Sequence, residues 1–282
     1  MQLLGAHMSI AGGVQNSLVR AEKLGCTAMQ IFLKQPRKLF DREISYESIE
    51  EWKKNLKKIK TIPIDAILAH TGYLINLAVP DDEKWESYIS AMADEMSRAD
   101  SLGILHIVLH PGSPHDRDEK WGIQRVASAI DKIYSEEKFD VNIALETTAG
   151  TGSHLGWKFE HLADIISQSK FSEKLDVVFD TCHAYAAGYD FTTQEKYEHI
   201  WDEFDRIIGL KKLVGIPLND SKHPLGSRKD RHEHIGKGFL GIEPFRLIMQ
   251  DSRFVDIPKV LETPKDDDWD NKNLKLLREL SL

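Results

Sequence analysis

Imidazole and carboxylate side chains recur in this sequence at the ends of short apolar runs. Six such runs, rich in Val, Ile and Leu, end on a metal-binding or proton-transferring residue: His7, His70, His110, Glu146, Asp180 and Glu262. Buried groups of this kind cost free energy unless they are paired, and a metal ion pairs several of them at once. Each residue alone is more often a hydrogen-bonded core residue or a helix N-cap, but together they predict a metal cluster.

Two local spacings add to this set. In residues 180–183 (Asp-Thr-Cys-His), a carboxylate ends a run and an imidazole follows in what we expect to be a loop. Asp230 and His232 are two residues apart, which places both side chains on one side of an extended segment. Carboxylates and imidazoles without thiolates suit zinc, or less specifically manganese or iron.

The elements that must position these residues alternate along the chain. Eight short apolar runs predict buried parallel strands at residues 3–7, 28–33, 64–70, 104–110, 141–146, 175–180, 213–218 and 260–262. Amphipathic segments between them predict helices at residues 17–24 (with Gly25 as C-terminal cap), 45–59, 81–102, 121–134, 158–168, 192–208 and 242–249. This alternation predicts one (β/α)₈ TIM-barrel domain over residues 1–282, in which all strand C-termini meet at one face. A doubly wound sheet is the alternative, but no dinucleotide fingerprint is present.

Other motifs that carry chemistry are absent from the sequence. Residues 150–156 are glycine-rich and follow a strand, but no Gly-Lys-Ser/Thr follows, so a tight βα turn is favoured over a phosphate loop. Neither a GxSxG elbow nor an HExxH helix occurs. Serine-hydrolase and zincin functions therefore find no support.

Composition sets broader limits. The 282 residues carry a formal net charge of −8, which argues mildly against non-specific binding to nucleic acids. Two distant cysteines, Cys26 and Cys182, offer no disulfide framework, so we expect a reducing cytoplasm. We also expect no signal peptide and no membrane span, because no window holds the ~20 apolar residues that a span needs.

The sequence resembles the endonuclease IV family over essentially its whole length, with motifs in order and at nearly constant spacing. The resemblance rests on residues 5–9 with Gly12 and Gly13, 72–77, 110–113 (His-Pro-Gly-Ser), 146–150 with Gly152 and Gly156, 179–184 (Phe-Asp-Thr-Cys-His-Ala), 218–222, 226–232 and 261–264 (Leu-Glu-Thr-Pro). It implies a TIM barrel with a trinuclear zinc site at the C-terminal face of the strands.

The resemblance also implies which residues bind each metal ion. The first zinc takes His70, His110 and Glu146; the second takes Glu146 as a bridge, Asp180 and Glu262; the third takes His183, Asp230 and His232. Glu146 and Glu262 are the implied catalytic residues, Glu262 by orienting or deprotonating the nucleophile.

One position departs from the family pattern. The family normally has histidine where this chain has Pro217, and that histidine would complete the second zinc site. Proline offers no side-chain ligand and also removes a strand N–H donor. Neither His223 nor His234, although close in sequence, is implied as a replacement. The second site is therefore expected to lack one ligand.

The implied activity is hydrolysis of the phosphodiester on the 5′ side of an abasic site in double-stranded DNA, leaving a 3′-hydroxyl and a 5′-deoxyribose phosphate. The implied DNA-contacting residues, which enter the minor groove and stabilise the flipped-out sugar, are Gln35, Arg37, Tyr73 and Leu74. Positive charge is expected near the phosphates in residues 34–38 and at Lys222, Arg228, Lys229 and Arg231, although Lys38 itself is expected to be ordinary solvated surface. A monomer in the cytoplasm, associated with the nucleoid in a prokaryote, is the expected state.

Two other functions stay open at this point. A sugar isomerase or epimerase on the same barrel would use a single metal at a site like that of Glu146, Asp180 and Glu262. A catalytically impaired protein that binds abasic DNA without cutting it is favoured by Pro217 alone. The number of metal ions per chain separates the first alternative from the nuclease, and incision by the metal-loaded protein separates the second.

Overall fold

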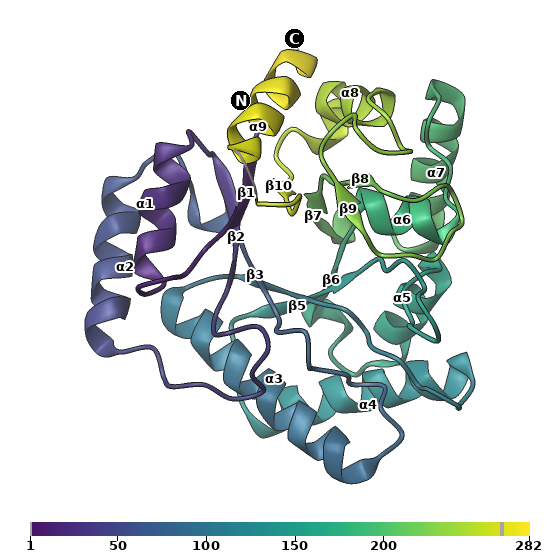
Figure 1. The fold of residues 1–282 in the computed structure, drawn as a ribbon. Helices are drawn as coiled ribbons and strands as arrows, with labels where there is room; N and C mark the ends of the chain where they lie inside the picture. Colours follow the sequence, from purple (N-terminus) through teal and green to yellow (C-terminus); the bar gives the residue numbers. More distant parts are fainter. Residues whose placement is uncertain (1, 266–267) are drawn as a thin grey trace.

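Eight parallel strands form a closed barrel in the order β1-β10-β7-β6-β5-β4-β3-β2. The computed structural model describes residues 2–265 and 268–282. Helices surround the barrel, which Figure 1 views along its axis. The barrel strands are β1 (Leu4–Met8), β2 (Ala28–Phe32), β3 (Ile67–His70), β4 (His106–Leu109), β5 (Asn142–Glu146), β6 (Leu175–Val178), β7 (Leu213–Pro217) and β10 (Lys259–Leu261). The predicted (β/α)₈ barrel is confirmed.

All seven predicted helices are present. They are α1 (Gln15–Lys23), α2 (Tyr46–Lys58), α3 (Asp82–Leu102), α4 (Glu119–Glu136), α5 (Phe159–Gln168), α7 (Gln194–Ile207) and α8 (Glu243–Gln250). The residues described also form three elements that the sequence did not predict: α6 (Thr181–Ala187), α9 (Trp269–Leu280), and a two-stranded antiparallel ribbon of β8 (Asp220–Ser221) and β9 (His232–Glu233).

Local sequence signals begin and end these helices. The Asp81 side chain accepts a hydrogen bond from the Lys84 backbone N–H and caps α3, and Gly103 ends that helix at a φ of 72°. Gly25, the predicted cap of α1, has a φ of 66°. Such a left-handed residue favours glycine.

Three strands are shorter than predicted by two residues or more. Residues 64–66 form a 3-10 turn before β3, in which the Ala66 N–H donates to the carbonyl of Pro63. The strand β4 starts two residues late, at His106, and β6 stops at Val178, where its register against β7 shifts. Apolar runs locate buried strands but do not reveal where ladder pairing stops, so these end residues were over-assigned.

Side chains inside the barrel lie in layers. Leu68, Val108, Ala144 and Val178 form one buried apolar cluster, to which Gly215 of β7 lies close. Because side chains alternate along a strand, the next interior position on each strand is two residues further on, toward the C-terminal face. On β3, β4, β5 and β6 those positions are His70, His110, Glu146 and Asp180. The apolar layer thus lies directly beneath the polar layer and separates it from the rest of the barrel interior.

The two ends of the chain lie close together, where α9 contacts β1 (Figure 1). Within residues 2–265 and 268–282, no helix combines the length and apolar character that crossing a lipid bilayer requires.

Candidate metal centre

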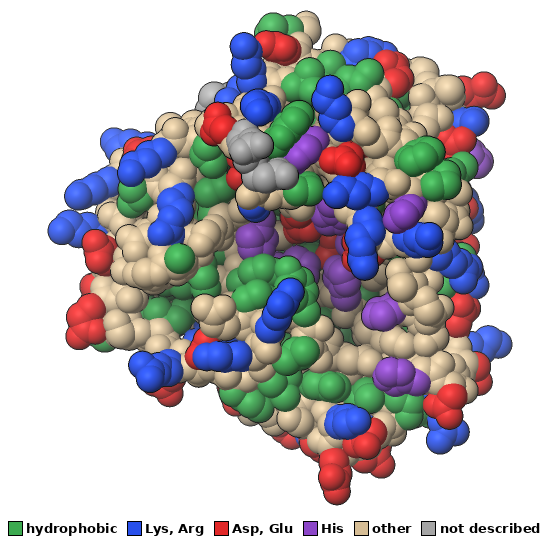
Figure 2. Space-filling view, viewed as in Figure 1, with side chains coloured by type: hydrophobic (Ala, Val, Ile, Leu, Met, Phe, Trp, Pro, Cys, Tyr) green, Lys and Arg blue, Asp and Glu red, His purple; other side chains and the backbone are tan. Residues whose placement is uncertain are grey.

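A polar cleft of about 410 Å³ opens at the C-terminal end of the barrel. Figure 2 shows histidines gathered around a hollow at the centre of this face, with Lys and Arg side chains along its rim. Six of the eight predicted ligands line the cleft: His70, His110, His183, Asp230, His232 and Glu262. The other two, Glu146 and Asp180, are fully buried. The structure therefore brings the whole predicted set to one place.

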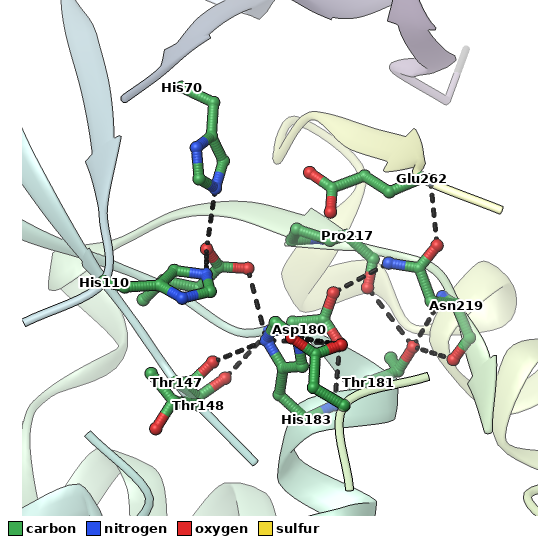
Figure 3. A network of polar contacts seen from close by, with 12 residues as sticks. His70, His110, Thr147, Thr148, Asp180, Thr181, His183, Pro217, Asn219 and Glu262 are labelled. Carbon is green, nitrogen blue, oxygen red and sulfur yellow. Dashed lines mark hydrogen bonds and ion pairs between the residues drawn. The ribbon is translucent and has the colours of Figure 1, made fainter. Parts of the chain in front are cut away.

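The first group consists of His70, His110 and Glu146. The Nε2 atoms of His70 and His110 lie 3.1 and 2.8 Å from Oε2 of Glu146. His70 ends β3 and His110 directly follows β4 (Figure 3), and Glu146 ends β5. Three neighbouring strands thus present three donor atoms to one point.

The second group consists of His183, Asp230 and His232. Asp230 Oδ1 lies 3.2 Å from Nε2 of His183 and 3.5 Å from Nε2 of His232. Asp230 and His232 approach on one side of an extended segment, as predicted. The prediction that His183 lies in a loop is wrong: it stands in the first turn of α6.

Asp180 is both the N-cap of α6 and a member of the cluster. Its Oδ1 accepts a hydrogen bond from the His183 backbone N–H at 2.7 Å, which begins the helix. Its Oδ2 accepts a hydrogen bond from Asn219 at 2.7 Å and lies 3.8 Å from Nε2 of His232. The cap fixes the spacing between Asp180 and His183, so the helix itself orients the imidazole.

Backbone carbonyls orient three of the imidazoles. Nδ1 of His70 donates to the Thr71 carbonyl at 2.8 Å, Nδ1 of His183 to the Thr147 carbonyl at 3.0 Å, and Nδ1 of His232 to the Glu262 carbonyl at 3.1 Å. A carbonyl only accepts, so it places the proton on Nδ1 and leaves Nε2 free to bind a metal.

The charged side chains of the cluster strongly shift one another's pKa values. Burial would raise the pKa of Glu146, but His110, His183 and His70 hold it well below its ordinary value. Burial would lower the pKa of His70, but Glu146 raises it to about 9. Partial desolvation of its carboxylate, followed by the nearby charge of Glu146, raises the pKa of Glu262. The carboxylates thus depend on the positive charge that imidazoles or a cation provide.

The donor atoms fit metal ions. Zinc ligands at 2.0–2.1 Å in tetrahedral geometry lie about 3.3 Å from one another, close to the 2.8–3.5 Å separations within both groups. Oε1 of Glu146 is buried without a hydrogen-bond partner, which would cost free energy in the absence of a cation.

Glu262 lies at the wall of the cleft and outside these two groups. Its carboxylate accepts a hydrogen bond from Nε2 of Gln30, and its backbone N–H donates to Asn219 Oδ1 at 2.8 Å. Gln30 also lies 3.1 Å from Nδ1 of His7. Gln30 and Asn219 were not among the residues predicted from the sequence. For Gln30 the available signal was a polar glutamine within the otherwise apolar run at residues 28–33.

His7 belongs to neither group, although it lines the cleft. Its Nε2 atom is buried without a hydrogen-bond partner. Burial, together with the nearby His70 and Lys265, lowers the pKa of His7 to about 3. It is therefore a neutral imidazole.

Pro217 ends β7 beside Asp180, Asn219 and Glu262 (Figure 3). The N–H groups of Ile216 and Leu218 both donate to neighbouring backbone carbonyls, of Pro258 and Val260. The backbone nitrogen of Pro217 therefore points toward β6. The register of β6 against β7 is already irregular there, so the missing N–H donor breaks no regular ladder hydrogen bond. His234 does not replace the missing ligand: its ring stacks on Trp269 at 4.0 Å, and Asn273 lies 3.3 Å from its Nδ1.

Two exposed loops border the cleft and carry the predicted DNA-contacting residues. Gln35 and Arg37 are exposed on the β2–α2 loop, and Tyr73 and Leu74 on the β3–α3 loop are 66% and 44% exposed. The Tyr73 N–H donates to the Pro36 carbonyl at 2.9 Å, so the two loops are hydrogen-bonded to each other.

One expectation for the basic residues was wrong. Lys34 does not face solvent: it is buried and lies 3.1 Å from Asp94 and 3.3 Å from Glu95 of α3. The carboxylates of Asp94 and Glu95 neutralise the Lys34 ammonium group, so Lys34 is not available to bind a phosphate. Exposed basic residues on this side include Arg37, Lys38, Lys222, Arg228, Lys229, Arg231 and Lys265, of which Lys265 lines the cleft.

The glycine-rich residues 150–156 form a turn between β5 and α5, as expected. The Thr148 N–H donates to the Gly156 carbonyl at 3.1 Å and closes the turn. A Cβ on Gly156 would lie 2.9 Å from the backbone carbonyl of Glu146. Glycine is required here because the loop passes directly over the strand that carries Glu146.

Comparison with known proteins gives consistent matches over the whole chain. A family model described as a xylose isomerase-like TIM barrel matches residues 18–280. A probable endonuclease 4 of Trichlorobacter lovleyi is 44% identical over 280 residues, covering 98% of this chain and 99% of that protein. A probable endonuclease 4 of Geobacter sulfurreducens is 45% identical over 284 residues, covering 98% and 94%.

Solved structures give the same result. The crystal structure of endonuclease IV from Thermus thermophilus matches with a TM-score of 0.86 at 35% identity, covering 98% of both chains. A D-tagatose 3-epimerase-like protein matches with a TM-score of 0.74 at 18% identity, covering 99% of this chain and 97% of that one. At that identity the likeness is one of fold alone.

Proposed function

The chain belongs to the endonuclease IV family of AP endonucleases, and we infer that it hydrolyses the phosphodiester on the 5′ side of an abasic site in double-stranded DNA. The products would be a 3′-hydroxyl and a 5′-deoxyribose phosphate. The observation that carries this proposal is the pair of imidazole-rich groups at the base of an open cleft. Glu146 contacts both, through Oε2 to His70 and His110 and through Oε1 toward His183.

The proposed metal is zinc, in up to three ions. His70, His110 and Glu146 would hold the first; Glu146, Asp180 and Glu262 the second; His183, Asp230 and His232 the third. Bound zinc lowers the pKa of water to about 7 and neutralises charge on a phosphate. Imidazole nitrogens and carboxylate oxygens are the donors that zinc prefers when thiolates are absent.

The protein's own residues supply orientation and proton handling. Glu146 is buried beneath the cleft and joins the two groups, so it fixes the distance between them. Glu262 lies at the cleft wall, where substrate has access, and Gln30 and Asn219 hold it in place. We assign it the role of orienting the nucleophile and accepting its proton.

DNA would lie across the face that carries the two loops. Tyr73 and Leu74 project large apolar surfaces next to the cleft, a chemistry suited to wedging a base step apart. Arg37 and Gln35 on the adjoining loop would contact the backbone of the same DNA. The net charge of −8 does not oppose DNA binding at this face, because bound cations would neutralise four of the carboxylates there (Glu146, Asp180, Asp230 and Glu262).

We further propose that residues 1–282 act as one domain and as a monomer in the cytoplasm. Both cysteines are buried and free, which suits a reducing compartment. Association with the nucleoid would follow from the substrate.

The test is incision of an end-labelled duplex that carries one tetrahydrofuran abasic analogue. This analogue cannot undergo β-elimination, so cleavage reports hydrolysis. Protein stripped of metal and reloaded with zinc should cut on the 5′ side and leave a 3′-hydroxyl that a DNA polymerase extends. The stripped protein should not cut, and an intact duplex of the same sequence should stay whole.

Two outcomes would favour other functions. Binding of the abasic duplex without incision at any metal loading would indicate a DNA-binding protein in which Pro217 has impaired catalysis. A single metal ion per chain, together with turnover of a ketose, would indicate a sugar epimerase instead. Either result contradicts the nuclease.

A further inference from the structure

The uppermost layer inside the barrel is polar on seven strands and apolar on one. Each strand places one interior residue in this layer, two positions beyond a small or aliphatic one. Taken around the chain, these residues are His7, Gln30, His70, His110, Glu146, Asp180, Pro217 and Glu262. Strand β7, which lies between β6 and β10, therefore contributes no polar side chain to the part of the cluster that it borders.

The absence of a polar side chain on β7 changes which donor atoms are available to a metal ion next to this strand. The carboxylates of Asp180 and Glu262 lie next to Pro217 (Figure 3), and a carboxylate oxygen of Glu146 lies within 4.8 Å of one of Asp180. We call the region that these three carboxylates border the oxygen site. Two imidazoles border the oxygen site but are turned to other partners. Nδ1 of His183 lies 3.6 Å from Glu146 and 3.8 Å from Asp180 but donates to the Thr147 carbonyl. Nε2 of His232 lies 3.8 Å from Asp180, and both imidazoles direct Nε2 to Asp230. The oxygen site thus offers carboxylate oxygens, whereas each of the other two groups offers two imidazole nitrogens.

Neutral amides hold the carboxylates of the oxygen site. Asn219 donates to Asp180 Oδ2 at 2.7 Å and accepts from the Glu262 backbone N–H at 2.8 Å, and Gln30 donates to the Glu262 carboxylate. Asn219 is fully buried, as is Gln30. Amides orient the oxygens without neutralising them, so negative charge remains for a cation to balance.

We propose that the oxygen site binds a divalent cation that prefers oxygen ligands, with Mn²⁺ as the probe, in place of a third tightly held zinc ion. Carboxylate and water oxygens suit Mg²⁺ and Mn²⁺, whereas zinc gains most from imidazole or thiolate. Zinc still binds most sites more tightly than manganese does, so the difference shows once free and weakly held zinc has been removed. This inference rests on the proposed function for the role of the cluster, but its test measures metal binding.

Cys182 is the one side chain nearby that offers a softer ligand. Its sulfur, together with Asp180 and His232, forms a group whose donor atoms lie within 4.8 Å of one another. The thiol is fully buried and directed toward the Arg231 carbonyl at 3.6 Å, so it is already engaged elsewhere. Ligation by this thiol is a distinct outcome, because a thiolate bound to Co²⁺ gives an intense charge-transfer absorption.

The experiment counts metal ions in the full chain. Protein stripped by a chelator is loaded with excess zinc and passed through a desalting column, and the retained zinc is measured by elemental analysis. Mn²⁺ is then titrated, and the loss of its free electron paramagnetic resonance signal gives the number bound. We expect two retained zinc ions and one Mn²⁺ per chain, with no charge-transfer band on cobalt substitution.

Two substitutions at one position separate ligand from backbone. Pro217→His supplies an imidazole and should raise the affinity for a third zinc by at least about tenfold, since even residues that only orient a ligand change metal affinity 10–100-fold. Pro217→Ala restores the N–H without a ligand and should behave like the unchanged protein. Three tightly retained zinc ions in the unchanged protein, equal effects of the two substitutions, or a thiolate band would each overturn the inference.

Incision assays on the same preparations keep the two proposals apart. If a preparation with three tightly held zinc ions cuts the abasic duplex, the nuclease is supported and the oxygen-site proposal is contradicted. If the metal counts are as expected but no preparation cuts the duplex at any metal loading, including Pro217→His, the oxygen site is supported and the nuclease is contradicted.

Discussion

The metal cluster and the two loops above it are held in opposite ways. Every predicted ligand except Asp230 and His232 stands at a barrel strand end or in the adjoining helix α6, and Glu146 and Asp180 are fully buried. Exposed loops carry Gln35, Arg37, Tyr73 and Leu74, and these loops are connected to α3 through the ion pairs of Lys34 and the hydrogen bond from Gly72 to Glu95. The cluster is therefore positioned by the barrel itself, whereas the loops depend on side-chain pairs outside it.

This difference sets what a substitution should change. Loss of a ligand removes charge from a dry, pre-formed centre, where each interaction is strong. Loss of a loop contact changes how well DNA is engaged and leaves the metal ions in place. Metal content and the split between kcat and KM are thus the measurements that tell the two regions apart.

The largest effect is expected from Glu146→Gln. The variant keeps the shape of the side chain but lacks the charge that joins His70, His110 and His183. It should lose bound metal, and kcat should fall by roughly 10³-fold or more, the equivalent of several kcal/mol of transition-state stabilisation. Glu160→Gln, an exposed carboxylate on α5, is the control. Full metal content with normal turnover in Glu146→Gln would contradict its role as the bridge.

The cluster was predictable because periodicity carried most of the information. An apolar run that ends on His or Glu places that residue in the upper layer of the barrel whatever the exact strand ends are. What the sequence could not show was α6, a seven-residue helix in which Asp180 serves as the N-cap. Its roughly two turns are too short to produce a helical period. Asn219 could not be predicted either, because its role depends on the Asp180 carboxylate and the Glu262 backbone N–H, both far away in the sequence.

A smaller effect is expected from the double substitution Tyr73→Ala, Leu74→Ala. Removing both apolar side chains should weaken binding to abasic duplex by about 10- to 100-fold, since stacking on one aromatic ring contributes about 1–3 kcal/mol. Zinc content should not change. Leu105→Ala, a half-exposed leucine just before β4 at the other end of the barrel, is the matched control. Equal losses in both variants would mean that the loops do not probe DNA.

Arg37→Ala should have an effect of roughly tenfold on binding at low salt. One phosphate contact is lost, so the slope of log affinity against log salt should become shallower by about 0.9. Lys38→Ala is the matched control, because Lys38 pairs with Asp41 at 3.0 Å on the same loop and carries the same charge. Identical salt slopes for the two variants would remove Arg37 from the interface.

The loop residues came from family resemblance, and periodicity alone did not indicate them. Exposed Tyr, Leu and Arg side chains are common on loops, so their types carry no signal of their own. The error over Lys34 has the same origin. A lysine in a basic stretch predicts a solvated charge, and nothing in the sequence shows that Asp94 and Glu95, some 60 residues later, bury it.

The smallest effect, and the one that tests the comparison most directly, is expected from Glu95→Gln. Glu95 is fully buried on α3, accepts the Gly72 N–H at 2.9 Å and lies 3.3 Å from Lys34. It therefore joins the loop that carries Arg37 to the loop that carries Tyr73. Glutamine keeps the shape and one acceptor oxygen but loses the ion pair. KM for abasic duplex should rise about two- to tenfold, the equivalent of a net 0.5–1.5 kcal/mol, with kcat and zinc content unchanged.

The control for Glu95→Gln must remove a charge from the same helix without touching the loops. Glu86→Gln does so, because Glu86 is exposed on α3 and pairs with Lys132 of α4. Thermal unfolding of both variants separates a general loss of stability from misplaced loops, since a merely destabilised protein would recover its normal KM at lower temperature. If Glu95→Gln lowers kcat and metal content instead, α3 supports the metal cluster as well as the loops, and the two regions are not independent.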